Sequence, residues 1–302
     1  MKDAATLRFQ LYLPKESRFT GKTLPKEEVF SYGRFQVHID RYSPKEPKET
    51  VVMIHGLGQN GRYLSFIASR LLKDGYEVIC PDLPFFGYTV HEGTVNYEDV
   101  IDLMSYLGDS LKKPVFMAGT GFGGTAAYDA ACAMKSVKGV MTTMYPDPKD
   151  LASQVSFCGS EERYRDVTDN LKRWQWLLPG KKIPLEDVAD FSKITNHPDA
   201  SKIIREDPHA GKCVLQMRYL YSLMNHEFRK KPEEFDRCPV LLAMPEDDAW
   251  FAVRERKGFF ERIKAPKCEC VLPGAGHLPL ETEGVNALLS AMEEFMGRII
   301  RN

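Results

Sequence analysis

The sequence predicts an α/β protein with a mostly parallel sheet flanked by helices. Short apolar runs, such as residues 51–54 and 115–118, alternate along the chain with segments whose apolar residues recur at helical spacing, such as residues 96–111. A glycine or a proline follows closely after the runs, as it does where strands feed loops. Strands that alternate with helices require right-handed crossovers, which produce a parallel sheet covered on both faces.

The expected core elements form two blocks. In the first block we expect strands at residues 35–40, 51–54, 77–80, 114–118 and 137–144, and helices at residues 63–73, 96–111 and 122–134. In the second block we expect strands at residues 239–244 and 268–272, and helices at residues 251–263 and 285–300. Residues 1–33 show little periodicity, and we expect a polar leader there.

The alternation of strand and helix patterns stops between Tyr145 and about Phe235, where several amphipathic stretches follow one another. We therefore expect a core of residues 1–145 and 236–302, and a mostly helical cap of residues 146–235 inserted after the core strand that ends near residue 144. Aromatic residues of the cap, among them Trp174 and Trp176, could line an apolar pocket or pack between cap helices.

Composition excludes several classes of partner. The 302 residues carry 41 basic and 42 acidic side chains, a net charge of −1, which predicts no nucleic-acid partner and no anionic-membrane footprint. No apolar run reaches membrane-spanning length, so we expect no stable membrane insertion. Seven scattered cysteines favour a reduced, cytoplasmic location. The Cys268-Glu269-Cys270 triplet lacks a second ligand pair, so no metal is expected.

A glycine-rich turn, GTGFGG at residues 119–124, follows an expected strand and precedes an Ala-rich helix. This is the place of a G-x-S-x-G nucleophile elbow, but Gly121 stands where the elbow holds serine. A plain glycine-rich turn is the simpler alternative. A phosphate loop would end in G-K-[ST], and a dinucleotide-binding turn would follow the first strand; neither condition is met.

Two further strand ends carry polar residues in the matching order. Asp248, with Asp247 as the alternative, follows the expected strand 239–244, where an acid can orient a histidine. His277 lies in a glycine-containing loop after the last strand, where it can act as a general base. In an acyl-transfer enzyme, the backbone amides of Leu57 and Phe122 would stabilise an oxyanion.

Together these residues resemble the α/β-hydrolase superfamily over residues 34–145 and 236–300. The His55-Gly56-Leu57-Gly58 turn and the later Pro81-Asp82 pair are similar to those of the lysophospholipase or monoglyceride-lipase branch. The resemblance implies that position 121 is the nucleophile position, Asp248 the acid and His277 the base. It also implies that the Leu57 and Phe122 amides form the oxyanion hole, and that residues 146–235 shape the substrate pocket.

The leading hypothesis is a serine-hydrolase-type enzyme for esters, thioesters or amides that acts through an acyl-enzyme and is inactivated here by Gly121. One alternative is an enzyme in which His277 and Asp248 work without a nucleophile, in C–C cleavage, elimination or cofactor-free oxygenation. Another is a pseudoenzyme that only binds an apolar ligand. All three predict a small, apolar substrate or ligand and no cofactor; a homodimer is compatible with each.

Overall fold

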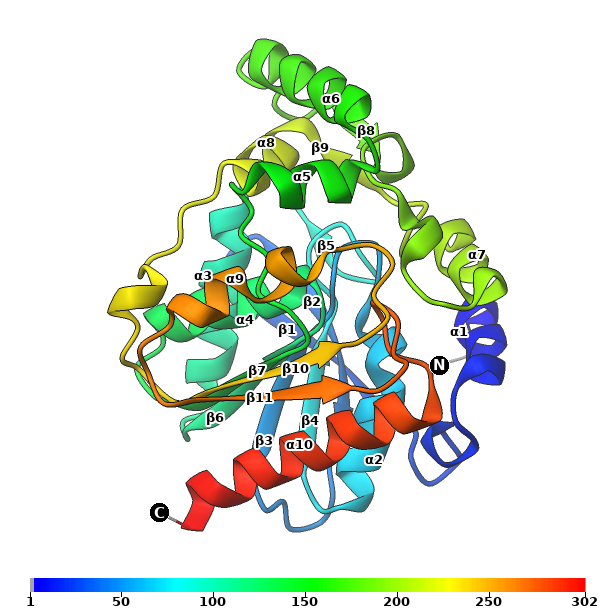
Figure 1. Ribbon diagram of the computed structural model, residues 1–302, viewed down its shortest axis with the longest axis vertical. Helices are drawn as coiled ribbons and strands as arrows, with labels where there is room; N and C mark the ends of the chain where they lie inside the picture. Colours follow the sequence, from blue (N-terminus) through cyan, green and yellow to red (C-terminus); the bar gives the residue numbers. More distant parts are fainter. Residues whose placement is uncertain (1–2, 302) are drawn as a thin grey trace.

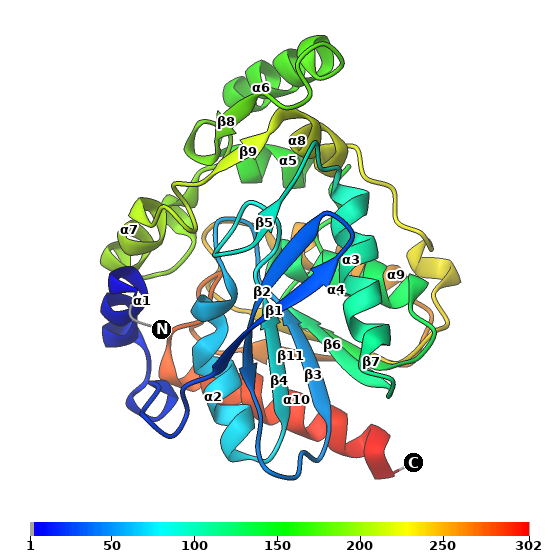
Figure 2. The ribbon, with the colours of Figure 1, turned by 180° about the vertical axis from the view of Figure 1, so that it is seen from behind.

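A nine-stranded sheet forms the centre of the computed structural model, which describes residues 3–301 (Figures 1 and 2). The strand order is β1-β2-β4-β3-β6-β7-β10-β11, with β5 paired to β2. The strands are β1 Lys26–Tyr32, β2 Phe35–Tyr42, β3 Thr50–Ile54, β4 Glu77–Pro81, β5 Val90–His91, β6 Val115–Gly119, β7 Val137–Thr142, β10 Val240–Pro245 and β11 Lys267–Leu272. From β4 to β11 neighbouring strands are parallel, and β2 pairs antiparallel with β1, β4 and β5.

Helices cover both faces of this sheet, and the predicted fold class is confirmed. On one face α2 (Ser65–Lys73), preceded by the 3-10 turn η3 (Gly61–Leu64), contacts α10 (Thr282–Arg301). On the other face lie α3 (Tyr97–Ser110), α4 (Phe122–Ala133) and α9 (Val253–Arg262) (Figure 1). Strands β3, β4, β6 and β10 are buried along their whole length, which explains why they are continuous apolar runs in the sequence.

The N-terminal region differs from the expected polar leader. It folds into α1 (Ala4–Phe9), the 3-10 turns η1 (Gln10–Tyr12) and η2 (Lys15–Ser17), and the edge strand β1. Phe9 is fully buried against Tyr63, with ring centroids 4.9 Å apart. These elements are too short to produce a periodic apolar pattern, and their order comes from contacts with the rest of the molecule.

Residues 146–235, called the insertion below, add no strand to the central sheet. They form α5 (Leu151–Cys158), α6 (Glu161–Trp174), α7 (Pro198–Glu206), α8 (Met217–Met224) and the 3-10 turns η4 (Leu185–Asp187), η5 (Phe191–Lys193) and η6 (Pro232–Glu234). An antiparallel pair, β8 (Lys182–Pro184) with β9 (Val214–Gln216), was not expected from the sequence. Within residues 3–301, no helix has both the length and the apolar character needed to cross a bilayer.

Candidate active site

Four loops bring the predicted site residues to one edge of the sheet. Leu57 follows β3, Gly121 follows β6, Asp248 follows β10 and His277 follows β11. These strands are parallel to one another, so their carboxyl ends lie at the same edge, where ligands bind in open α/β sheets.

Gly121 connects β6 to α4 by a sharp turn. Its backbone has φ 54° and ψ −130°, a conformation that residues with a side chain rarely adopt. The Gly121 amide donates to Thr143 Oγ1 at 3.2 Å. A strained turn of this kind is the backbone that a nucleophile elbow requires.

The glycines around this turn are not equivalent. A Cβ added to Gly119 or Gly123 would lie 2.2 Å or 2.3 Å from a backbone atom, and one added to Gly124 would lie 1.7 Å from Thr142 Oγ1. Those three positions therefore admit only glycine. At Gly121 the nearest atom would be His277 Nε2 at 3.0 Å, so a side chain fits there if the imidazole gives way slightly. The packing thus leaves room for a small side chain at position 121, directed at His277.

His277 and Asp248 form a buried pair. Their Nδ1 and Oδ2 atoms are 3.0 Å apart, and His277 is only 6% exposed. Asp248 Oδ1 accepts from the backbone amides of Trp250 at 2.8 Å and Phe251 at 3.0 Å. Burial raises the pKa of Asp248, but the charge and hydrogen bond of His277 outweigh it and hold this pKa below its ordinary value. Because a carboxylate only accepts, Nδ1 is the donor in this pair, and Nε2 faces position 121.

The two amides expected to bind an oxyanion lie in adjoining loops. A Cβ at Gly56 would be 3.0 Å from the Thr120 carbonyl oxygen, so the loop that carries Leu57 rests against the turn that carries Phe122. Among residues 3–301, neither the Leu57 nor the Phe122 amide has a hydrogen-bond acceptor. Phe122 is also the first residue of α4, where the helix dipole favours negative charge.

The chain matches the alpha/beta hydrolase family over residues 51–288, which is most of its length. It belongs to this family. Solved structures with a similar fold include a monoacylglycerol lipase of Paleococcus ferrophilus, at 20% identity and a TM-score of 0.67 over 91% of this chain and 99% of that one. A comparison with curated protein sequences found no match.

Two other solved structures extend the comparison. A soluble variant of monoglyceride lipase from Saccharomyces cerevisiae, in complex with a substrate analog, is 17% identical, with a TM-score of 0.76 over 95% of this chain and 98% of that one. A thermophilic esterase from Thermogutta terrifontis, with malate bound, is 19% identical, with a TM-score of 0.62 over 91% of this chain and 99% of that one. At these identities the similarity shows the fold alone.

Aromatic side chains enclose the imidazole of this α/β hydrolase. Trp250 lies edge-on to His277 at 4.9 Å between centroids, and Phe251 stacks on it at 5.4 Å. Trp250 also packs on Phe191 of the insertion and donates from Nε1 to the Ser156 carbonyl at 2.8 Å. The roles of Trp250 and Phe251 were not predicted, although both stand within three residues of Asp248 and so could have been considered.

The insertion contacts two of the four loops that carry the candidate site residues. The Leu278 amide, next to His277, donates to the Ile194 carbonyl at 2.9 Å. Phe191 packs so closely on Gly58 that a Cβ there would lie 2.4 Å from its ring. The insertion therefore contacts the loop that carries Leu57 and the loop that carries His277.

Arg256 is a second residue that the sequence did not reveal. It is 2% exposed, its Nη1 donates to the Pro245 carbonyl, and its Nε lies 4.0 Å from Asp248 Oδ2. Burial lowers the pKa of Arg256, and Asp248 opposes that effect. Its positive charge supports the Asp248 carboxylate. Arginine is common in amphipathic helices, so nothing in the sequence of α9 marked Arg256 as a site residue.

Several other polar residues of the motifs have structural roles. The Thr120 hydroxyl donates to Gln59 Oε1 at 3.4 Å, which directs it toward the Leu57 loop. His55 is fully buried and joins the Gly56 carbonyl at 2.8 Å to the Leu83 amide at 2.9 Å. Burial lowers the pKa of His55, which fits a neutral imidazole that connects two loops.

One cluster of possible metal ligands lies apart from this edge. Atoms of Glu27, His38 and Asp40 approach within 4.8 Å of one another. Arg62 already supplies positive charge there, with Nη2 at 3.0 Å from Glu27 and Nε at 3.5 Å from Asp40. The His38 Nδ1 is engaged with Asp82 at 2.8 Å. This donor set fits an ion-pair cluster better than a cation site.

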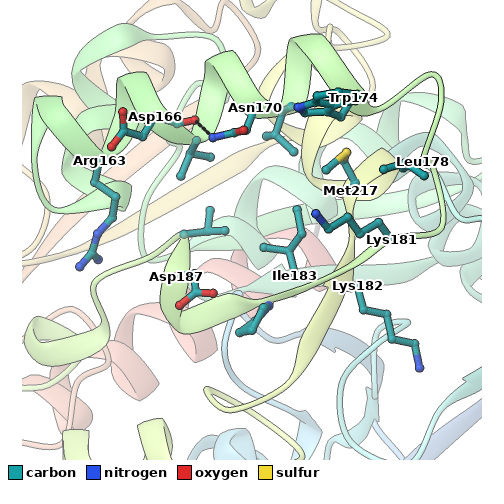
Figure 3. A pocket seen from close by; sticks show the side chains of 14 residues that line it. Arg163, Asp166, Asn170, Trp174, Leu178, Lys181, Lys182, Ile183, Asp187 and Met217 are labelled. Atoms are coloured by element: carbon teal, nitrogen blue, oxygen red, sulfur yellow. Dashed lines mark hydrogen bonds between the residues drawn. The ribbon is translucent and has the colours of Figure 1, made fainter.

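A groove of about 710 Å³ lies within the insertion, between α6 and the segment around β8 (Figure 3). Trp174, Leu178 and Met217 lie at one part of it, and Ile183 faces them. None of Gly121, Asp248 and His277 lines it. The groove is therefore separate from the candidate catalytic residues.

Proposed function

We propose that this α/β hydrolase carries a serine-hydrolase-type site for esters, thioesters or amides, and that Gly121 makes this chain an impaired form. The observation that supports it most is the direction of His277. Its Nε2 lies 3.0 Å from where the Cβ of residue 121 would be, while Asp248 orients the ring from behind. A base aimed at the one glycine of residues 119–124 that packing does not require is what removal of a nucleophile would leave.

The chemistry follows from this arrangement. With serine at position 121, His277 Nε2 takes the hydroxyl proton as the oxygen attacks the substrate carbonyl carbon. The amides of Leu57 and Phe122 stabilise the resulting oxyanion. His277 then gives the proton to the leaving group, and water hydrolyses the acyl-enzyme by the same route. With glycine no acyl-enzyme forms, and loss of a triad serine costs on the order of a million-fold in turnover.

The insertion would act as the cap of this site, with residues 1–145 and 236–302 as the catalytic core. Its Phe191, together with Trp250 and Phe157, presents an apolar wall beside His277. Apolar walls select apolar acyl groups. Lipases and an esterase among the structurally similar proteins are consistent with that class of substrate.

The test is the Gly121→Ser variant. We expect it to react covalently with a fluorophosphonate probe and to hydrolyse p-nitrophenyl esters at least about a thousand-fold faster than the parent chain, within the range expected for a triad serine. Gly121→Ala, which adds Cβ without a nucleophile, and the double variant Gly121→Ser/His277→Ala are the controls, and both should stay inactive. A folded Gly121→Ser protein without labelling would refute the proposal.

A second candidate has its own supporting observation. Nε2 of His277 has no hydrogen-bond partner among residues 3–301, yet the Asp248 pair remains intact. His277 could therefore deprotonate a bound substrate, in C–C cleavage, elimination or cofactor-free oxygenation. In that case the parent chain is active on the right substrate, and His277→Ala abolishes this activity. Ligand binding that is unchanged by His277→Ala, with no activity in either protein, would instead indicate a binding protein.

A further inference from the structure

Apolar side chains are left uncovered where α6 ends and the chain turns toward β8. Trp176 and Leu177 are 71% and 72% exposed, and Leu178 and Trp174 are 46% and 36% exposed. Residues 171–183, called the tryptophan loop below, connect α6 to β8 at the end of the molecule that lies away from the C-terminus (Figures 1 and 2). Single exposed apolar residues are normal, but four within five positions mark an interaction surface.

The tryptophan loop has a defined shape. Gln175 is fully buried in its middle and accepts from Arg218 Nη1 at 2.6 Å. The amides of Leu177 and Leu178 both donate to the Trp174 carbonyl, at 3.0 Å and 2.9 Å. The Arg218 guanidinium also lies over the Trp176 ring at 4.7 Å. These contacts hold the indole rings at the surface, so their exposure is built into the fold.

The charge of the loop is strongly one-sided. Residues 171–183 contain Lys172, Arg173, Lys181 and Lys182, all exposed, and no acidic residue. None of these four cations forms an ion pair with another residue in 3–301. The acidic residues of α6 lie within residues 161–169, before the loop. A net charge of −1 for the whole chain therefore conceals a local positive surface.

The apolar surface continues inward from the loop. Trp174 and Leu178 also line the 710 Å³ groove, together with Val167, Ile183 and Met217 (Figure 3). Lys181 and Lys182 lie along the same groove, whereas Asp166 and Asp187 line the part away from Trp174 (Figure 3). Apolar surface bordered by lysines thus extends from the tip of the loop into the nearer part of the groove.

We propose that the tryptophan loop binds this protein reversibly to the surface of an anionic lipid bilayer. Indole rings partition to the boundary between head groups and acyl chains, because one end of the ring is apolar and the other can hydrogen-bond. Lysine and arginine beside them meet anionic head groups. The exposed tryptophan and leucine can therefore contact the acyl-chain boundary while the neighbouring cations contact the head groups. The loop would lie at the bilayer surface without crossing it. This binding does not depend on the chemistry at position 121.

The test is co-sedimentation of the full chain with vesicles, of phosphatidylcholine alone or with about a third of phosphatidylserine, at low and high salt. We expect binding to the anionic vesicles that weakens with salt, and a blue shift of tryptophan emission. Trp176→Ser/Leu177→Ser should weaken binding at least about tenfold, because it removes the two most exposed apolar side chains. Changing Lys172, Arg173, Lys181 and Lys182 to Gln should remove the preference for anionic vesicles.

Matched controls distinguish binding through the tryptophan loop from nonspecific binding to vesicles. Lys15, Lys22, Lys45 and Lys264 are exposed and lie elsewhere, so their change to Gln alters net charge equally and should leave binding intact. Val29→Ser removes an apolar side chain that is 67% exposed on β1, and it too should have no effect. Equal loss in both charge variants would overturn the proposal. Absence of vesicle binding would also overturn it, and a dimer that the loop variants dissociate would assign the surface to a second copy instead.

Discussion

The backbone conformation of Gly121 favours glycine, but the packing around it leaves room for a small side chain. The φ of 54° is unfavourable for other residues, whereas the nearest atom to an added Cβ is a side-chain atom of His277. Strain of this kind is typical of functional turns and costs about 1–3 kcal/mol when a side chain is present. Glycine at position 121 therefore leaves this turn without side-chain strain.

Gly121→Ala should accordingly lower the free energy of unfolding by about 1–3 kcal/mol, because alanine must adopt the strained φ. Urea unfolding followed by circular dichroism measures the change. The matched control is Gly258→Ala in α9, where an added Cβ meets nothing within 4 Å and no positive φ is present. That variant should gain up to about 1 kcal/mol from helix propensity. A stabilised Gly121→Ala protein would show that the turn is unstrained.

The acid of the proposed triad can be tested against its neighbour. In the Gly121→Ser background, Asp248→Asn should lower turnover by roughly four orders of magnitude, because an amide in place of the carboxylate favours the wrong imidazole tautomer. Asp247→Asn is the control. Asp247 is exposed, and its side chain forms no hydrogen bond or ion pair with His277 in the described structure. Comparable losses in both variants would contradict the assignment of Asp248.

At the scale of elements, a buried histidine joins the end of the insertion to the core. His226 follows α8, and its Nε2 lies 2.9 Å from Asp129 of α4 while its Nδ1 lies 3.3 Å from Glu98 of α3. Arg229 of the same connection also reaches Asp129, with its amide at 2.8 Å. Burial alone would lower the pKa of His226, but the hydrogen bonds to Asp129 and Glu98 outweigh it and raise this pKa to about 9.

This cluster predicts a pH dependence of stability. A histidine whose pKa rises on folding stabilises the folded state fully below its ordinary value of 6.5, and this contribution is lost as the pH rises through about 9. The shift corresponds to on the order of 3 kcal/mol. The difference in unfolding free energy between the parent and His226→Gln should therefore be largest near pH 6 and shrink by about pH 10. A difference that does not change with pH would show that His226 is uncharged when folded.

At the scale of the whole molecule, the N-terminal segment connects core and insertion. Helix α1 contacts α7 of the insertion (Figure 2), and Phe9 is buried against Tyr63. The Tyr63 hydroxyl donates to Asp207, just after α7, at 2.8 Å. The N-terminal segment thus braces the insertion at α7.

Phe9→Ala should destabilise the protein by about 3–5 kcal/mol, since it removes a fully buried ring. The control is Leu11→Ala, at a position that is 67% exposed, which should change stability by less than about 0.5 kcal/mol. Thermal unfolding compares the two. Equal small effects would mean that the N-terminal segment contributes little to the stability of the fold.

The sequence by itself determined the fold class, the strand ends that carry the candidate site and the unusual residue at 121. It could do so because buried parallel strands are continuous apolar runs and because the elbow has fixed glycine spacing. Only the tertiary structure showed that Asp248 pairs with His277, brought Arg256 and Trp250 to the candidate site, and ordered the N-terminal segment. It also showed that Trp176 is exposed while Phe191 packs against Trp250 and Gly58. Contacts between residues far apart in the chain decide burial and orientation, and no local pattern contains them.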